Sequence, residues 1–287
     1  MVMRLQSVFG MVVLFLLCAV ADASAQSLSS MEYGLSALDN WSGCSQCTTK
    51  TSLNYTHSQI NQLDTELNSD GMGKKFKFFN NYVWPNDMIE DELGGNDYAF
   101  ADGVELYALS SHGDAVVENG QQVYYPSMCS YTENVACEPS SKKMVMGEQS
   151  SYTYGTVHPG RLLWLILATC FSVDTNPSQQ WKLPFMYGLE MVMGYRGESA
   201  DSTFTDEVLA DFAGNAFGGE SKFKQVWFSA TEDWYIDDTS GIITCHGTNT
   251  GYTTDDLINR LNNYRRTWTK RYNNGTQRAC AYAHHQG

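Results

Sequence analysis

One short stretch of continuous apolar sequence limits the folds open to this chain more than any other. Leu162 to Ala168 (LLWLILA) has no polar position. A strand that is apolar throughout is buried on both faces, which is typical of the centre of a parallel sheet. Val104 to Ser110 (VELYALS) has the character of a second buried strand. The two runs favour an α/β fold with a mostly parallel sheet and helices on both faces.

Further segments alternate helix and strand patterns and support the same class. Their spacing of apolar residues, capping residues and glycines defines them. In chain order, we expect a helix over 57–69, a strand over 76–83, a core segment over 188–195, helices capped by Thr205 and Ser221, a strand over 241–245 and a helix opened by Thr253. The sequence shows no repeat and no clear linker, so residues 56–287 are predicted to form a single domain.

Composition excludes several classes of protein. With 43% hydrophobic and 13% aromatic residues, the chain can bury a large core, so disorder cannot dominate. It carries 18 Lys and Arg against 32 Asp and Glu, a net charge of −14. Nucleic acids and anionic membranes require a basic surface. We therefore expect no nucleic-acid partner and no binding to anionic membranes.

The first 25 residues have the pattern of a secretory signal. Arg4 supplies the positive start, residues 8–20 are apolar but too short to span a bilayer, and Ala23-Ser24-Ala25 fits the cleavage rule. We expect a mature protein that begins at Gln26, is secreted (extracellular or periplasmic) and is not inserted in a membrane. Residues 26–55 are rich in Ser, Thr and Asn and are predicted to be an irregular segment pinned by its cysteines.

An exported chain is expected to pair its cysteines. Seven remain after the signal, an odd number, so at least one thiol is free or pairs between chains. The pairing we favour, one of 15 possible for six cysteines, is Cys44–Cys47, Cys129–Cys137 and Cys245–Cys280. It leaves Cys170 unpaired. Cys44 and Cys47 remain open to a redox or zinc-binding role.

Two strong strands end in residues that could carry chemistry. His112 follows the strand at 104–110, and Cys170 follows the strand at 162–168. Sites in open α/β sheets form beyond the carboxyl ends of the strands. A His beside a thiol can accept its proton and generate a nucleophilic thiolate. The Gly113 N–H could then donate to an oxyanion. This chemistry needs no cofactor and no metal.

At these residues the chain resembles the caspase, legumain and gingipain group of cysteine peptidases. The matching segments are LYALSSHGD (106–114) and LLWLILATC (162–170). The resemblance implies a caspase-like α/β sandwich with His112 as base, Cys170 as nucleophile and Gly113 in the oxyanion hole.

The sequence is more closely similar to an uncharacterised family of secreted proteins that carries a domain-of-unknown-function label (DUF6345) and is thought to share this fold. The likeness extends over roughly 57–237 and includes Val83 to Met88 (VWPNDM), Gly94-Gly95 and the two site strands. The chain departs from relatives at Ala168, Thr169 and Phe171, next to the thiol. These departures affect the substrate pocket more than the fold.

Other residues could play parts in this site. His246 precedes a glycine and is a rival base, although its neighbour Cys245 is more naturally a disulfide partner. Asp114 and Glu105 could orient His112, but caspase-like enzymes need no fixed third acid. Trp84 and Trp181 are expected in the core. His284 and His285 are expected to fray at the terminus.

The first function hypothesis is a secreted cysteine endopeptidase, with a polypeptide substrate and with residues 115–160 lining or covering the cleft. Its acidity favours a basic residue at the cleavage site, but the sequence identifies no pocket carboxylate. The second is a non-catalytic binding module for a surface protein or glycan, because 17 Tyr and 7 Trp suit such contacts. A thiol–disulfide protein using Cys44 and Cys47 is a third, weaker idea.

Overall fold

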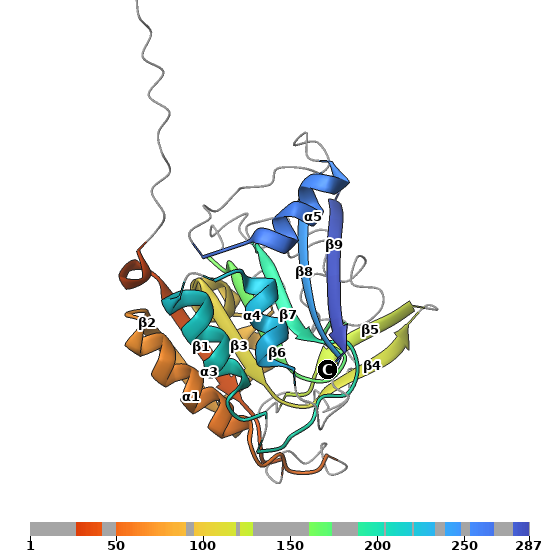
Figure 1. The fold of residues 1–287 in the computed structure, drawn as a ribbon. Helices are drawn as coiled ribbons and strands as arrows, with labels where there is room; N and C mark the ends of the chain where they lie inside the picture. Colours follow the sequence, from red (N-terminus) through yellow and green to blue (C-terminus); the bar gives the residue numbers. More distant parts are fainter. Residues whose placement is uncertain are drawn as a thin grey trace, which may run out of the picture.

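A computed structural model gives the three-dimensional structure of the chain (Figure 1). The described residues are 27–41, 50–89, 95–118, 121–128, 161–173, 189–203, 205–219, 221–232, 239–247, 253–266 and 278–286. Four features predicted from the sequence lie outside these ranges: the signal sequence, the Cys44–Cys47 and Cys129–Cys137 pairs, and Trp181. Most of the long polar segment at 115–160 also lies outside them.

The described residues form a seven-stranded sheet in the order β2-β1-β3-β6-β7-β8-β9. The strands are β1 (Glu32–Ala37), β2 (Gly73–Phe79), β3 (Leu106–Ser110), β6 (Trp164–Ala168), β7 (Met191–Tyr195), β8 (Thr239–Gly247) and β9 (Arg278–Gln286). The first five strands of that order run parallel, and β8 pairs antiparallel with β7 on one side and with β9 on the other. The structure therefore confirms an α/β fold with a mostly parallel sheet.

The sheet lies between two hydrophobic cores. Successive residues of the central strands alternate between them: Leu106 and Ala108 face one core, and Tyr107 and Leu109 face the other. Every residue of β3 and β6 is buried. These two segments can be largely apolar because they are buried on both faces. They pair with each other near the centre of the sheet.

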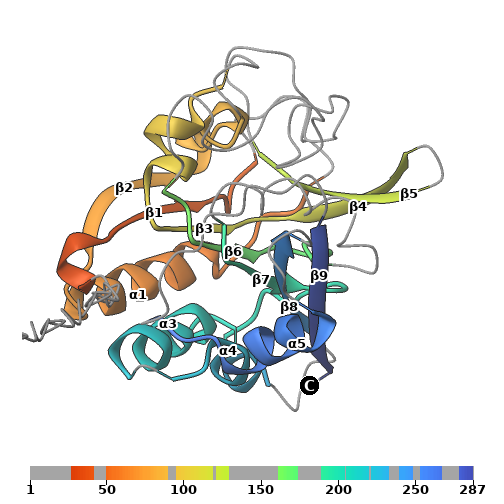
Figure 2. The ribbon, with the colours of Figure 1, turned by 90° about the horizontal axis from the view of Figure 1, so that it is seen from above.

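The α-helices lie together on one side of the sheet, as the view from above shows (Figure 2). They are α1 (Thr56–Ser69), α3 (Val208–Ala213), α4 (Phe223–Ala230) and α5 (Thr254–Asn263), and α3 continues into a π-helical turn, η9 (Gly214–Gly218). On the other side, the described residues form short 3₁₀ turns: η2 (Asn80–Tyr82), η3 (Pro85–Asp87), η5 (Asp97–Ala99) and η6 (Ala101–Gly103). A further 3₁₀ turn, η1 (Leu28–Ser30), precedes β1.

The amino-terminal segment is not wholly irregular. The prediction for 26–55 is wrong at β1, which pairs with both β2 and β3. Its sequence EYGLSA mixes polar residues and glycine, so no apolar run marks it. Gly34 is needed there, because a Cβ would lie 2.1 Å from the Phe76 ring. Residues 32–37 therefore belong to the same sheet as the rest of the domain.

The carboxyl terminus is also ordered. His284 and His285, expected to fray, lie in β9, which pairs along its whole length with β8. A disulfide joins Cys245 to Cys280 across these two strands, which confirms this predicted pair. Cys170 is the free cysteine of the described residues, as the odd number of cysteines led us to expect.

Two predicted helix caps are wrong. The Thr205 hydroxyl closes a local turn with Ser202 instead, and α3 begins three residues after it. The residue that precedes α4 is Lys222 rather than Ser221. Thr253 does cap α5, because its side chain accepts from the Asp256 N–H at 3.2 Å. No helix in the described ranges is long and apolar enough to cross a membrane.

Candidate functional site

Strand register brings His112 and Cys170 to the same edge of the sheet. Ser110 at the end of β3 is paired with Ala168 at the end of β6. Each of the two predicted site residues follows its strand after one intervening residue. The Ser111 N–H donates to the Ala168 carbonyl at 3.3 Å, so the turns leave the sheet side by side. The predicted position beyond the carboxyl ends of the strands is therefore the observed one.

Gly113 lies against the backbone of Cys170. A Cβ added at Gly113 would lie 2.0 Å from the Cys170 carbonyl oxygen and 2.9 Å from its nitrogen. Glycine is therefore required for the two turns to approach this closely. The structure thus brings the His-Gly turn and the cysteine turn into direct contact.

The His112 ring is held by a backbone carbonyl. Nε2 lies 2.8 Å from the Thr51 oxygen. A carbonyl oxygen can only accept, so Nε2 carries the proton of the neutral ring and Nδ1 carries the lone pair. The Trp41 ring packs against the imidazole, with centroids 5.7 Å apart. The Thr51 carbonyl thus orients the ring, a role that the sequence suggested Asp114 or Glu105 could play.

Neither of those acids is available for that role. Asp114 forms an ion pair with Lys50 at 2.5 Å and accepts from the Ser127 hydroxyl at 2.9 Å. Glu105 lies before β3, at the opposite end of the strand from His112, where both of its oxygens bind Arg161. Both carboxylates stabilise the fold around the strands rather than the imidazole.

The Cys170 thiol contacts the loop that follows β7. The Ser199 N–H donates to Sγ at 3.3 Å, and the Ser199 hydroxyl lies 3.8 Å from it. The next residue along the chain, Phe171, has a φ of 59°, which is unusual for a bulky side chain. Its N–H donates to the Gly197 carbonyl at 2.8 Å. Strained backbone of this kind clusters at active sites and ligand clamps.

A cavity of about 300 Å³ opens at this edge. Its walls come from the turns after β3, β6 and β7 and from the segment that precedes α1. It is lined by Lys50, Leu53, Thr56, Gln59, Ser110, Ser111, His112, Gly113, Asp114, Ala168, Cys170, Phe171, Tyr195, Glu198, Ser199, Ala200 and Asp201. The predicted site residues His112, Gly113 and Cys170 all face this one cavity.

The comparison with known families places this site within a shared domain. A family model described as a domain of unknown function, DUF6345, matches residues 40–276. The chain belongs to the DUF6345 family. A search of curated proteins gave no match. The matched DUF6345 region contains both site turns and the strands from β2 to β8.

The rival base of the DUF6345 domain lies at the wrong end of the sheet. In the antiparallel pair of β7 and β8, Tyr195 is opposite Ser240 and Val192 is opposite Ile243. His246 therefore lies beyond the amino end of β7, at the edge away from Cys170. The backbone alone excludes it as the partner of this thiol.

Several site residues of the DUF6345 domain could not be found from its sequence. Thr51, Glu198 and Ser199 lie on connecting segments, and only the folded chain brings them to the ends of β3 and β6. Trp84 was expected in the core, but 43% of its surface is exposed. Its indole N–H donates to the Asn81 carbonyl at 2.7 Å, which holds the ring at the surface.

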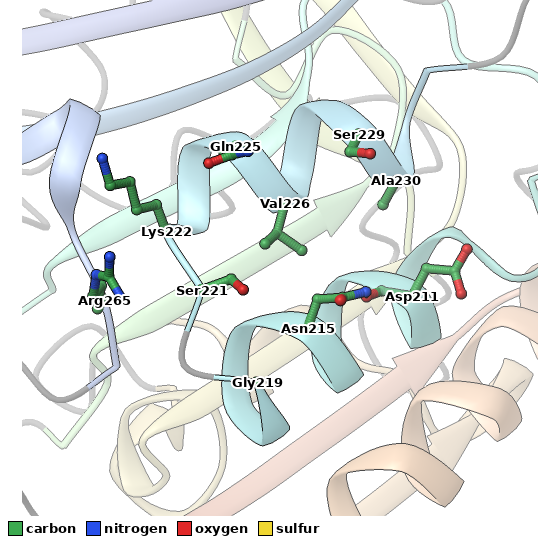
Figure 3. A pocket seen from close by; sticks show the side chains of 10 residues that line it. All are labelled: Asp211, Asn215, Gly219, Ser221, Lys222, Gln225, Val226, Ser229, Ala230 and Arg265. Carbon is green, nitrogen blue, oxygen red and sulfur yellow. The ribbon is translucent and has the colours of Figure 1, made fainter.

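A second cavity, of about 470 Å³, lies between the two helical segments α3–η9 and α4 (Figure 3). Lys222 and Arg265 lie at one end of it and Asp211 lies at the other. No cysteine or histidine lines it. Among the described residues, no group of three His, Cys, Asp or Glu side chains could hold a metal. Cys170 and His112 therefore line the smaller cavity and not this one.

Proposed function

We propose that this chain is an exported cysteine peptidase with a caspase-like site, and that Cys170 and His112 form its catalytic dyad. One observation carries the proposal. The His112-Gly113 turn is packed on the Cys170 backbone at the carboxyl edge of the sheet, with a cavity in front of both. A structural cysteine would not need this arrangement.

The reaction begins with proton transfer. His112 Nδ1 takes the Cys170 proton, and the thiolate attacks the scissile carbonyl. The bond between sulfur and carbon forms as the carbonyl electrons move to oxygen. His112 then donates its proton to the leaving amine, which departs and leaves a thioester. Water, deprotonated by His112, hydrolyses the thioester and restores the thiol.

Two backbone N–H groups, those of Ser199 and Gly113, would act on the reacting atoms: the first on the sulfur and the second on the substrate oxygen. The Ser199 N–H donates to the Cys170 sulfur, the atom that would attack the substrate. Ser127 donates to the His112 carbonyl at 2.8 Å. The neighbouring pair, Gly113 and Pro126, is therefore a non-hydrogen-bonded pair of the β4–β5 hairpin (Gly113–Glu118 and Gln121–Pro126). The Gly113 N–H points away from β5 and is available to an oxyanion.

Within the described residues, the His112 ring and the Cys170 sulfur have no direct hydrogen bond. Catalytic hydrogen bonds are often long before substrate binds and shorten in the complex. The hairpin that begins at Gly113 projects from the sheet beside the site (Figure 1). A polypeptide bound along it would present a carbonyl to both turns.

The test is cleavage of a complex peptide library by the mature protein, with new amino termini identified by mass spectrometry. We expect cleavage that is lost in Cys170→Ala and reduced at least about a hundredfold in His112→Ala. The disulfide of Cys245 and Cys280 should be intact in both variants, as a control for folding. Equal cleavage by wild type and Cys170→Ala would refute the proposal.

A non-catalytic binding module is the second candidate, and the exposed aromatic residues favour it. Tyr82, Trp84 and Tyr98 are 64%, 43% and 44% exposed on the segment of 3₁₀ turns. Exposed aromatic side chains are enriched where proteins bind partners. This function predicts that a surface protein or glycan binds equally well to wild type and to Cys170→Ala.

A further inference from the structure

The loop that follows β7 forms a wall of the cavity and is anchored at both ends. At one end the Gly197 carbonyl accepts from Phe171. At the other, the Asp201 carboxylate accepts from the backbone N–H groups of Asn54 and Tyr55, directly before α1. Between these anchors, Ser199 contacts the Cys170 sulfur. The backbone on both sides of Glu198 is therefore held close to the Cys170 turn.

The charges around this cavity are unequally compensated. Lys50 neutralises Asp114. The two N–H groups directly before α1 stabilise the charge of Asp201 by hydrogen bonding to its carboxylate. Glu198, which also lines the cavity, has no hydrogen bond or ion pair with any residue in the described part of the chain. It is therefore the lining carboxylate that is free to pair with a bound molecule.

We propose that Glu198 selects a basic side chain, Lys or Arg, on the residue whose carbonyl Cys170 attacks. This inference rests on the proposed peptidase function and names its substrate class. The cavity is at the small end of the range for ligand sites, about 300–1,000 Å³, which suits a single extended side chain. A Lys or Arg side chain in the cavity can form an ion pair with the Glu198 carboxylate, whereas an acidic side chain is repelled by it.

The buried side chain of Gln59 adds no charge to the cavity. Gln59 is buried and lines it, donating to the Thr205 carbonyl at 2.9 Å and accepting from the Ser110 hydroxyl at 2.8 Å. These groups satisfy one another and carry no charge. Because buried Gln59 is neutral and exposed Glu198 is unpaired among the described residues, charge discrimination falls to Glu198.

The experiment uses four peptidyl acyloxymethyl ketones that differ only in the residue at the reactive carbonyl: Lys, Arg, Leu or Asp. The Cys170 thiolate displaces the carboxylate of the reagent and forms a thioether, which adds a fixed mass to the mature protein. Labelling rates are measured by mass spectrometry for wild type, Glu198→Gln and Glu207→Gln. The last variant makes the same change of charge at an exposed glutamate outside the cavity.

We expect the Lys and Arg reagents to label Cys170 about tenfold faster than the Leu reagent, with the Asp reagent slowest. Glu198→Gln should lower the Lys and Arg rates about tenfold and leave the Leu rate unchanged, and Glu207→Gln should change none. Equal labelling by all reagents would overturn the specificity and leave the peptidase proposal standing. If no reagent labels Cys170, both proposals fail.

Discussion

The contact between Gly113 and Cys170 gives the sharpest prediction for a single added methyl group. In Gly113→Ala, the new Cβ would lie 2.0 Å from the Cys170 oxygen, whereas real Cβ contacts essentially never fall under 3.0 Å. The two turns must therefore move apart by about 1 Å. A displacement of that size in a reacting geometry costs on the order of a hundredfold in rate. The overpacked contact itself should cost about 1–3 kcal/mol of stability.

The assay compares peptide cleavage with urea unfolding for Gly113→Ala and for Gly197→Ala. Gly197 is also at the site, but a Cβ there would meet nothing within 4 Å. Gly197→Ala should keep wild-type cleavage and stability, whereas Gly113→Ala should lose about two orders of magnitude in cleavage. Wild-type cleavage and stability in Gly113→Ala would show that the turns are not in contact, and would refute the reasoning.

Three predictions concern the scaffold. Arg260 and Glu190 form a buried ion pair. Because Arg260→Met leaves the buried Glu190 charge unpaired, it should lower the free energy of unfolding by about 3–5 kcal/mol. An unchanged midpoint in urea titrations would contradict this. Burial raises the pKa of Asp87 to about 6, from 3.8 in the unfolded chain. Between these two pKa values the native state binds one more proton than the unfolded chain, so the free energy of unfolding falls by about 3 kcal/mol as pH rises from 4 to above 6. Asp87→Asn should remove this pH dependence, measured by urea unfolding at each pH. The same pH dependence in wild type and Asp87→Asn would contradict the raised pKa of Asp87. Replacing both Cys245 and Cys280 by alanine removes a bridge across a separation of 35 residues and should cost about 4 kcal/mol, measured by thermal unfolding without reductant; full stability would show that the bridge contributes nothing.

The central strands could be predicted because their runs of apolar residues indicate burial on both faces. Leu162 to Ala168 is apolar at every position, and the structure places it in β6, buried throughout. The strands β1 and β9 could not be found this way. Their residues are mixed or polar, and they are strands because β2, β3 and β8 pair with them in space.

Some residues of the candidate site could likewise be predicted from the sequence, and others could not. His112, Gly113 and Cys170 follow strong strands, so a rule about strand ends was enough to bring them together. Thr51 and Glu198 come from segments with no pattern of their own, and only the folded chain reveals what they contact. The sequence suggested only acidic side chains that could orient the His112 ring, whereas the group that binds the ring is the backbone carbonyl of Thr51.

The measurement that tests the catalytic dyad most directly is the rate at which iodoacetamide alkylates the native, non-reduced protein at pH 7, followed by peptide mapping. We predict rapid labelling of Cys170 in the wild type and labelling at least about tenfold slower in His112→Ala. Cys245 and Cys280 should stay unlabelled because they are joined in a disulfide. Labelling of Cys170 only after unfolding, or at the same rate in His112→Ala, would contradict the account.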